Sequence, residues 1–236
     1  AIIICPGGGY DHIAFREKDA PAMAFLNMGF QVFVLEYSLR EKAKNKKPLE
    51  QLARTIQHVR DNSKNWSVDS RRVLVMGFSA GGHLAASLGV HWNDPEIMIR
   101  CGVQDCKQLR PDGMVLAYPV ISTGEFAHNG TCQIITADTD ETEGYWSLET
   151  QVDSQTPPTF IWHTVNDEIV PVQNTLLFVN ALVNAGVSCE CHLFPNGPHG
   201  MSVCTDEVGT RSMEVGKWIE LCRNWVDSNF THLGGC

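Results

Sequence analysis

A serine flanked by glycines, in the motif Gly-Phe-Ser-Ala-Gly at residues 77–81, is the feature of this sequence that most plainly could do chemistry. Residues 73–76 form an apolar run of strand length before it, and small residues and good helix formers follow it from Leu84 onward. A strand that turns sharply into a helix leaves no room for side chains two positions on either side of its central serine, so glycine is favoured there. The pattern predicts a nucleophile elbow that presents Ser79 for acyl transfer.

A serine hydroxyl is a poor nucleophile at neutral pH and needs a base, together with a carboxylate that orients the base. Asp167 follows an apolar run of strand length at residues 159–163, and His199 lies in the Pro- and Gly-containing loop of residues 194–200 after the last such run. Strand ends deliver side chains to the same edge of a sheet as the elbow. We therefore predict that Ser79, His199 and Asp167 form a catalytic triad.

Other residues stay open as alternatives for the acid and the base. Glu168 is the nearest rival to Asp167, and His199 differs from the other histidines because it alone lies in a flexible loop after the final strand. The alternative histidines are His12, His83, His163 and His192. The alternative aspartates, which fall in a predicted insertion, are Asp138, Asp140 and Asp153.

A second glycine run, Pro-Gly-Gly-Gly-Tyr at residues 6–10, directly follows the first predicted strand. Glycines let backbone N–H groups turn toward a ligand with no Cβ in the way, as an oxyanion pocket requires. Ala80 begins the helix after the elbow, where unpaired N–H groups and the helix dipole favour a developing negative charge. We expect the amides of Gly8, Gly9 and Ala80 to hold the oxyanion. The run lacks the Lys-Ser or Lys-Thr pair and the glycine spacing of a phosphate loop.

The elements that position these residues alternate between apolar runs of strand length and segments of helical period, which is typical of a parallel sheet covered on both faces. The predicted strands are 1–5, 31–36, 73–76, 114–118, 159–163 and 188–193. The predicted helices are 19–27, 49–62, 80–90, 172–185 and 212–229. The fold class is therefore α/β, with a mainly parallel central sheet and helices on both faces.

Two stretches break this alternation. Residues 93–112 read as a polar connector rich in charged residues, and residues 121–155 form a long segment with no clear period. A segment of that length without structure of its own inside a compact domain is usually functional. We expect it to be a small cap over the site, inserted after the fourth strand of a single domain that spans residues 1–236.

The composition disfavours several classes of partner. A formal net charge of −9 and a pI near 5.4 argue against nucleic acid and anionic membrane surfaces. No apolar run reaches the roughly 18 residues that a membrane span needs. Neither Cys101 with Cys106 nor Cys189 with Cys191 has the spacing of a zinc site, so no metal is expected.

The nine cysteines are an odd number in a chain too long to need disulfide staples, which indicates reduced thiols and a cytoplasmic location. The chain opens directly on a strand without a methionine and is expected to be trimmed at its N-terminus. Any export signal would then lie outside the sequence.

With these residues in place, the chain resembles the α/β-hydrolase superfamily, and within it the small esterase/lipase-like group that includes acetylxylan esterases. The resemblance implies hydrolysis of short acyl esters, acetyl groups on plant polysaccharide fragments among them, with no metal or organic cofactor. The order serine, aspartate, histidine along the chain is the one that this topology imposes. The motifs that carry the resemblance are segments 5–10, 77–84, 118–120, 167–171 and 197–200.

Four aromatic side chains near the expected cleft are candidates to stack on a sugar or aryl group, and core packing accounts for them equally well. They are Tyr10, Trp92, Tyr118 and Trp146. Two other functions stay open: another hydrolase on the same scaffold, such as an arylformamidase or a serine peptidase, and a ligand-binding receptor with little turnover. The expected partner is a small-molecule or oligosaccharide ester, and a homo-oligomer is compatible with the sequence.

Overall fold

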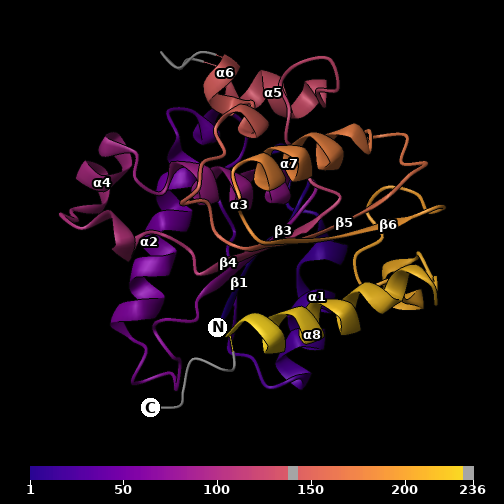
Figure 1. The fold of residues 1–236 in the computed structure, drawn as a ribbon, viewed down its shortest axis with the longest axis horizontal. Coiled ribbons are helices and arrows are strands. Elements are labelled where there is room, and N and C mark those ends of the chain that lie inside the picture. The colour runs from indigo at the N-terminus through magenta and orange to yellow at the C-terminus, as the bar shows by residue number, and fades with distance from the viewer. Residues whose placement is uncertain (138–142, 231–236) are drawn as a thin grey trace.

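The computed structural model describes residues 1–137 and 143–230, and its centre is a six-stranded sheet whose neighbouring strands all run parallel (Figure 1). The strand order is β2-β1-β3-β4-β5-β6. The strands are β1 (Ile2–Cys5), β2 (Val32–Val34), β3 (Leu74–Phe78), β4 (Gly113–Ala117), β5 (Thr159–Thr164) and β6 (Cys189–Phe194). Each strand predicted from an apolar run is therefore confirmed, with bounds that differ by at most two residues.

Helices cover both faces of this sheet. The five long helices are α1 (Asp19–Asn27), α2 (Lys47–Asp61), α3 (Ala80–His91), α7 (Gln173–Asn184) and α8 (Trp218–Phe230). Side chains alternate between the faces of a strand, so Ile3 and Cys5 pack in the core beneath α2, α3 and α7, whereas Ile2 and Ile4 pack with α1 and α8. Figure 1 shows these two layers above and below the sheet. The last helix begins later than the predicted Ser212.

The carboxyl ends of the strands lie along one edge of the sheet because all neighbouring strands are parallel. Cys5, the last residue of β1, pairs with Gly77 of β3, and Thr164 of β5 pairs with Phe194 of β6. The glycine run, the elbow and the loops predicted to carry the acid and the base therefore emerge at the same edge. This edge is where open α/β sheets bind their ligands.

The predicted polar connector at residues 93–112 is wrong in part, because it contains a helix, α4 (Pro95–Cys101). The Asp94 side chain caps this helix by accepting hydrogen bonds from the amides of Glu96 and Ile97. Proline at the first helical position fits because its fixed φ is helical and its missing N–H has no intrahelical partner there. The Ile97 side chain is fully buried, so the segment packs against the body of the protein.

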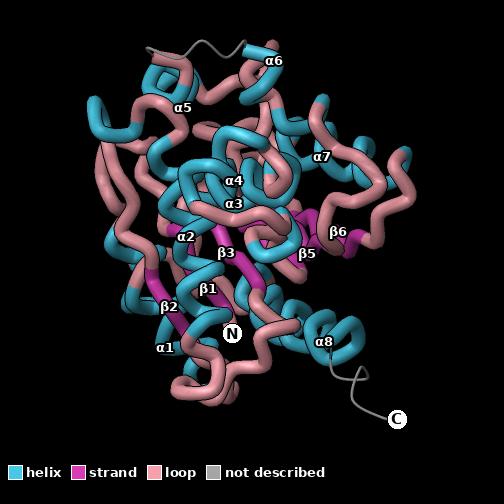
Figure 2. Tube along the Cα trace, turned by 90° about the vertical axis from the view of Figure 1, so that its left-hand side faces the viewer, coloured by secondary structure: helices cyan, strands magenta, loops and turns pink. Residues whose placement is uncertain are grey.

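The insertion expected after the fourth strand is present and carries two short helices, α5 (Asn129–Ile135) and α6 (Glu143–Trp146). Both views place these helices at one end of the molecule, beyond α3 (Figures 1 and 2). The buried Asn174 side chain on α7 accepts hydrogen bonds from the amides of residues 121 and 122 and so ties the start of the insertion. His83 on α3 lies 3.1 Å from the carbonyl oxygen of the last residue of α6 and ties its end.

The described residues offer neither a membrane span nor a metal site. Within residues 1–137 and 143–230, no helix has the length and apolar character to cross a bilayer, and no group of three or more His, Cys, Asp or Glu side chains could hold a metal ion. The described cysteines are free thiols. Burial raises the pKa of Cys191 to about 11 and that of Cys204 to about 12, so these thiols stay protonated at neutral pH.

Candidate active site

The elbow predicted at Ser79 is present and has the strained backbone expected of it. Ser79 joins the end of β3 to the start of α3 with φ 53° and ψ −120°, a conformation that L residues rarely adopt. A Cβ on Gly77 would lie 2.2 Å from the carbonyl oxygen of Gly81, and one on Gly81 would lie 2.0 Å from that of Cys5. Both glycines are therefore required by close backbone contacts, as the sequence predicted.

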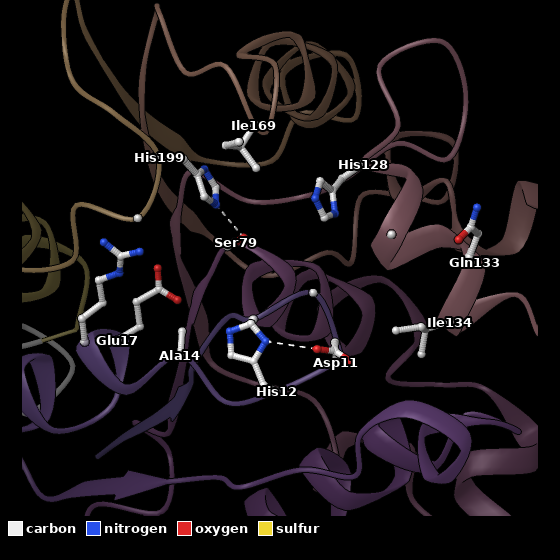
Figure 3. Close-up of a pocket in the computed structure, with 15 residues that line it drawn as sticks. Asp11, His12, Ala14, Glu17, Ser79, His128, Gln133, Ile134, Ile169 and His199 are labelled. Atoms are coloured by element: carbon white, nitrogen blue, oxygen red, sulfur yellow. Dashed lines mark hydrogen bonds and ion pairs between the residues drawn. The ribbon is translucent and has the colours of Figure 1, made fainter.

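Ser79, His199 and Asp167 form one hydrogen-bonded chain. The Ser79 Oγ lies 2.8 Å from the His199 Nε2, and the His199 Nδ1 lies 2.6 Å from the Asp167 Oδ2. A carboxylate only accepts hydrogen bonds, so the Nδ1–H donates to Asp167, which leaves Nε2 free to accept from the serine hydroxyl. Figure 3 shows the His199 ring directed at Ser79. Loops after three different strands, β3, β5 and β6, supply the three side chains.

The Asp167 carboxylate is buried and held on both oxygens. Its Oδ1 accepts hydrogen bonds from the amides of Ile169 and Val170, at 2.9 and 3.0 Å, and its Oδ2 also lies 3.3 Å from the His163 Nε2. Burial alone would raise its pKa, but the hydrogen bonds from His163 and His199 hold the pKa of Asp167 well below its ordinary value. The carboxylate therefore stays ionised at neutral pH and fixes the orientation of the imidazole.

Among the described residues, none of the alternative acids and bases forms a hydrogen bond with the Ser79 hydroxyl, whose partner is His199. His163 is held by Thr175, Val170 and the Asp167 carboxylate, His192 by Glu190, and His83 by Tyr10 and the end of α6. His12 is exposed beside Asp11, Glu168 is exposed, and Asp153 caps a turn at Gln155. Asp138 and Asp140 lie outside the described residues.

The glycine run forms a tight loop beside Ser79. Gly8 has φ 115° and Gly9 has φ 66°, and the Gly8 carbonyl oxygen accepts hydrogen bonds from the amides of Asp11 and His12. The Ala80 amide is at the first position of α3 and has no intrahelical acceptor. In residues 1–137 and 143–230, the amides of Gly8, Gly9 and Ala80 donate no hydrogen bond to another protein group. They are thus available to an oxygen next to Ser79.

These groups open into a cavity of about 540 Å³. Gly8, Gly9, Ser79 and His199 line it together with residues of the insertion. Figure 3 shows Ile169 beside His199, whereas His128, Gln133 and Ile134 lie on the other side of Ser79. The insertion contributes His128, Gly130, Gln133 and Ile134. The cavity therefore has room for a small acyl group and part of its alcohol beside the serine hydroxyl.

The four aromatic residues that were candidates to stack on a substrate are not among the residues that line this cavity, which favours the alternative of core packing. Their rings are buried, each at most 7% exposed, because large aromatic surfaces are better stabilised in the core than at the rim. Tyr10 and Trp146 both pack on His83, and Trp92 lies against Arg110. Tyr118 lies edge-on to the His199 ring.

Two residues that line the cavity were missed by the sequence analysis. Glu17 is only 2% exposed, but its position between Arg16 and Lys18 is typical of a solvated charged run. His128 caps α5 through its contact with Thr131, in a segment with no readable period, and burial lowers its pKa. A histidine placed three residues before a threonine, ahead of a short apolar run, was the available signal for that cap.

Comparisons with known proteins find several that are similar to this chain. The model of the BD-FAE family matches residues 1–182. An acetylxylan esterase of Xylanibacter ruminicola is 30% identical over 93% of this chain, and an endo-1,4-beta-xylanase B of Butyrivibrio fibrisolvens is 39% identical over 87% of it. Among solved structures, an acetyl ester-xyloside bifunctional hydrolase from Caldicellulosiruptor lactoaceticus superposes with a TM-score of 0.84 and 39% identity, covering 96% of this chain and 82% of that one.

The chain spans only part of the two curated relatives. It covers 45% of the acetylxylan esterase and 33% of the xylanase. Most of the xylanase therefore lies outside the matched region, and its named activity need not belong to the part that resembles this chain.

Proposed function

The chain belongs to the BD-FAE family of α/β-hydrolases, and on that premise we propose that it is a carboxylic ester hydrolase, a serine esterase that cleaves short-chain acyl esters. Acetyl esters of xylan or of another carbohydrate are the proposed substrates. The observation that carries the proposal is the unbroken hydrogen-bonded chain from the Ser79 Oγ through His199 to Asp167, at 2.8 and 2.6 Å, inside a cavity.

In the proposed mechanism, the His199 Nε2 takes the proton of the Ser79 hydroxyl as the Oγ attacks the ester carbonyl carbon. The tetrahedral intermediate collapses, the bond to the alcohol oxygen breaks, and His199 gives its proton to the departing alcohol. A water molecule then attacks the acyl-enzyme with the same assistance and releases the acid. Asp167 keeps the Nδ1 proton in place and stabilises the imidazolium that forms in each half-reaction.

The proposed oxyanion site consists of the amides of Gly8, Gly9 and Ala80. Full negative charge develops on the carbonyl oxygen only as the transition state forms. Hydrogen-bond donors that are already in place therefore stabilise the transition state more than they stabilise the bound substrate, and so they lower the barrier. The absence of other acceptors for these amides in the described residues supports the assignment. The start of α3 adds its dipole at the same point.

The named activities of the relatives support the choice of substrate. An acetylxylan esterase and an acetyl ester-xyloside hydrolase are both similar to this chain over more than nine-tenths of its length. The polar groups on the insertion side of the cavity, His128 and Gln133, can hydrogen-bond the hydroxyl groups of a sugar.

A panel of p-nitrophenyl esters from acetyl to octanoyl, with acetylated xylan, tests the proposal. We expect the highest kcat/KM for the acetyl ester and release of acetate from xylan, and a loss of roughly 10⁴-fold or more in Ser79→Ala. A preference for long acyl chains would contradict the short-chain assignment, and unchanged activity in Ser79→Ala would remove the serine from the mechanism. Turnover of N-formylkynurenine or of a peptide amide without ester hydrolysis would favour another hydrolase on this scaffold.

A further inference from the structure

The geometry points to Glu17 as a positioning residue of this active site. Its carboxylate joins the loop that carries the oxyanion amides to the segment that carries His199, and so fixes the distance between the oxyanion site and the base. The inference rests on the proposed function, because it assigns Glu17 a part in that same reaction.

Glu17 is a buried acid that the proposed mechanism leaves without a role. It ends a 3-10 turn, Phe15–Glu17, is 2% exposed and lines the cavity beside Ser79 (Figure 3). Within the described residues it forms no ion pair, whereas the other buried glutamate, Glu50, is paired with Lys47, Arg54 and Arg100. A buried carboxylate that forms no ion pair is costly unless hydrogen bonds satisfy its oxygens.

One oxygen of this carboxyl group holds the glycine loop. The Gly7 amide donates to the Glu17 Oε2 at 2.9 Å, and the Gly7 carbonyl oxygen accepts from the Ala14 amide at 2.9 Å. A Cβ on Gly7 would lie 2.5 Å from that Oε2 and 2.8 Å from the Ser79 Cβ. Gly7, the residue immediately before Gly8, is therefore held in a close space between Glu17 and Ser79.

The other oxygen reaches the segment that carries the base. The Tyr118 hydroxyl donates to the Glu17 Oε1 at 2.9 Å and accepts from the Ser202 amide at 2.9 Å, three residues beyond His199. The Tyr118 ring also lies edge-on to the His199 ring, with centroids 4.9 Å apart. A shift of the Glu17 carboxyl group would thus displace both Tyr118, which contacts the His199 imidazole, and Gly7, which precedes the oxyanion amides.

Both oxygens of the Glu17 carboxyl group accept a hydrogen bond, one from the Gly7 amide and the other from the Tyr118 hydroxyl. Burial raises the pKa of Glu17, and the hydrogen bonds from Tyr118 and Gly7 oppose that rise. A carboxamide of the same shape can accept at only one of the two positions. In Glu17→Gln the –NH₂ group must face either the Gly7 N–H, where two donors meet, or the Tyr118 hydroxyl, whose O–H then loses its acceptor.

The test compares Glu17→Gln, Tyr118→Phe and their double variant with the wild type, using p-nitrophenyl acetate hydrolysis and the rate at which a fluorophosphonate labels Ser79. We expect Glu17→Gln to lower kcat and the labelling rate by roughly 10- to 100-fold with KM within about twofold, because charge-assisted hydrogen bonds are lost. The double variant should be no slower than the slower single variant by more than about twofold, since both act through one chain of hydrogen bonds.

Glu50→Gln is the matched control, because it changes the other buried glutamate, which is not among the residues that line the cavity. It should lower Tm and leave kcat and labelling unchanged. The inference is overturned if folded Glu17→Gln keeps the wild-type kcat. It is also overturned if kcat and KM fall by the same factor, so that kcat/KM is unchanged. If Glu17→Gln does not fold, Tyr118→Phe alone decides in the same way. If the fluorophosphonate labels the wild type but the wild type hydrolyses no ester, the proposed function is contradicted. The ratio of the labelling rates of Glu17→Gln and the wild type then tests the role of Glu17 by itself.

Discussion

The two walls that face each other across the cavity are held in place by different means. One wall consists of the loops after the strands, where Ser79, His199 and Asp167 are joined by short hydrogen bonds and the glycine loop is clamped by Glu17. The other wall is α5, a helix of seven residues that presents Gln133 and Ile134 to the cavity.

This difference suggests that the strand-end wall carries out the reaction and that the α5 wall selects the substrate. A helix as short as α5 is not stable on its own in water, so its position depends on a few buried contacts such as those of Thr131 and Ile135. The strand-end wall is continuous with the sheet, whose strands are joined by backbone hydrogen bonds. Substitutions in the first wall should therefore change kcat, and substitutions in the second should change which esters bind.

Asp167→Asn should produce the largest effect. The amide cannot hold the imidazole in the required tautomer or stabilise the imidazolium, so we expect kcat for p-nitrophenyl acetate to fall by about 10³- to 10⁴-fold with little change in KM. Steady-state kinetics on folded protein, checked by circular dichroism, measures this. Residual activity above one-tenth of the wild type would show that the strand-end wall does not carry the reaction through Asp167.

Gly8→Ala should have the next largest effect. A Cβ there would lie 2.1 Å from the His12 carbonyl oxygen, at φ 115°, so the loop must move and its amide leaves the oxyanion site. We expect a loss of roughly 100-fold or more in kcat. Gly9→Ala is the matched control, because a Cβ at Gly9 meets nothing closer than 3.9 Å and only the strain of its positive φ is added. Equal losses in the two variants would argue against this geometry.

Gln133→Ala and Ile134→Ala, on the α5 wall, should have a smaller effect that depends on the substrate. We expect KM for an acetylated xylo-oligosaccharide to rise by roughly 2- to 10-fold, because each variant removes one contact from the cavity wall. The kcat for p-nitrophenyl acetate should stay within about twofold of the wild type. A comparable fall in kcat on both substrates would mean that the two walls are not independent.

The smallest effect concerns stability and His83, which joins the glycine run to the end of α6. Burial lowers the pKa of His83 from 6.5 to about 4, and the neutral ring binds both Tyr10 and the end of α6. The folded pKa is below the unfolded one, so stability is complete above pH 6.5 and falls as the pH drops toward 4, by up to about 1.4 kcal/mol per pH unit. Urea unfolding between pH 7 and pH 4 should show this slope in the wild type and a shallower one in His83→Gln.

The fold and the meeting of the three polar side chains were predictable from the sequence for physical reasons. Strands buried on both faces read as continuous apolar runs, and the glycines of the elbow are dictated by backbone contacts that no other residue allows. The order of Ser79, Asp167 and His199 follows from strand ends that share one edge. Their roles as nucleophile, acid and base remain predictions that the variants above test.

The walls of the cavity were not predictable in the same way. Whether Trp92 or Trp146 faces solvent depends on tertiary contacts: Trp92 lies against Arg110, and Trp146 packs on His83, which is distant along the chain. Glu17 has the sequence context of a surface acid, and only the tertiary arrangement of Gly7 and Tyr118 gives its carboxyl group two donors. The sequence around Glu17 does not predict these contacts, because Tyr118 is distant along the chain.

The distance along the chain between the reacting groups has a consequence for folding. Ser79 and His199 are 120 residues apart, and His199 follows β6, the outermost strand on its side of the sheet. Contacts of such long range form slowly because the loop they close must be ordered first. Regain of turnover after dilution from denaturant should therefore trail regain of the helical signal, and the lag between the two would time the docking of that final strand.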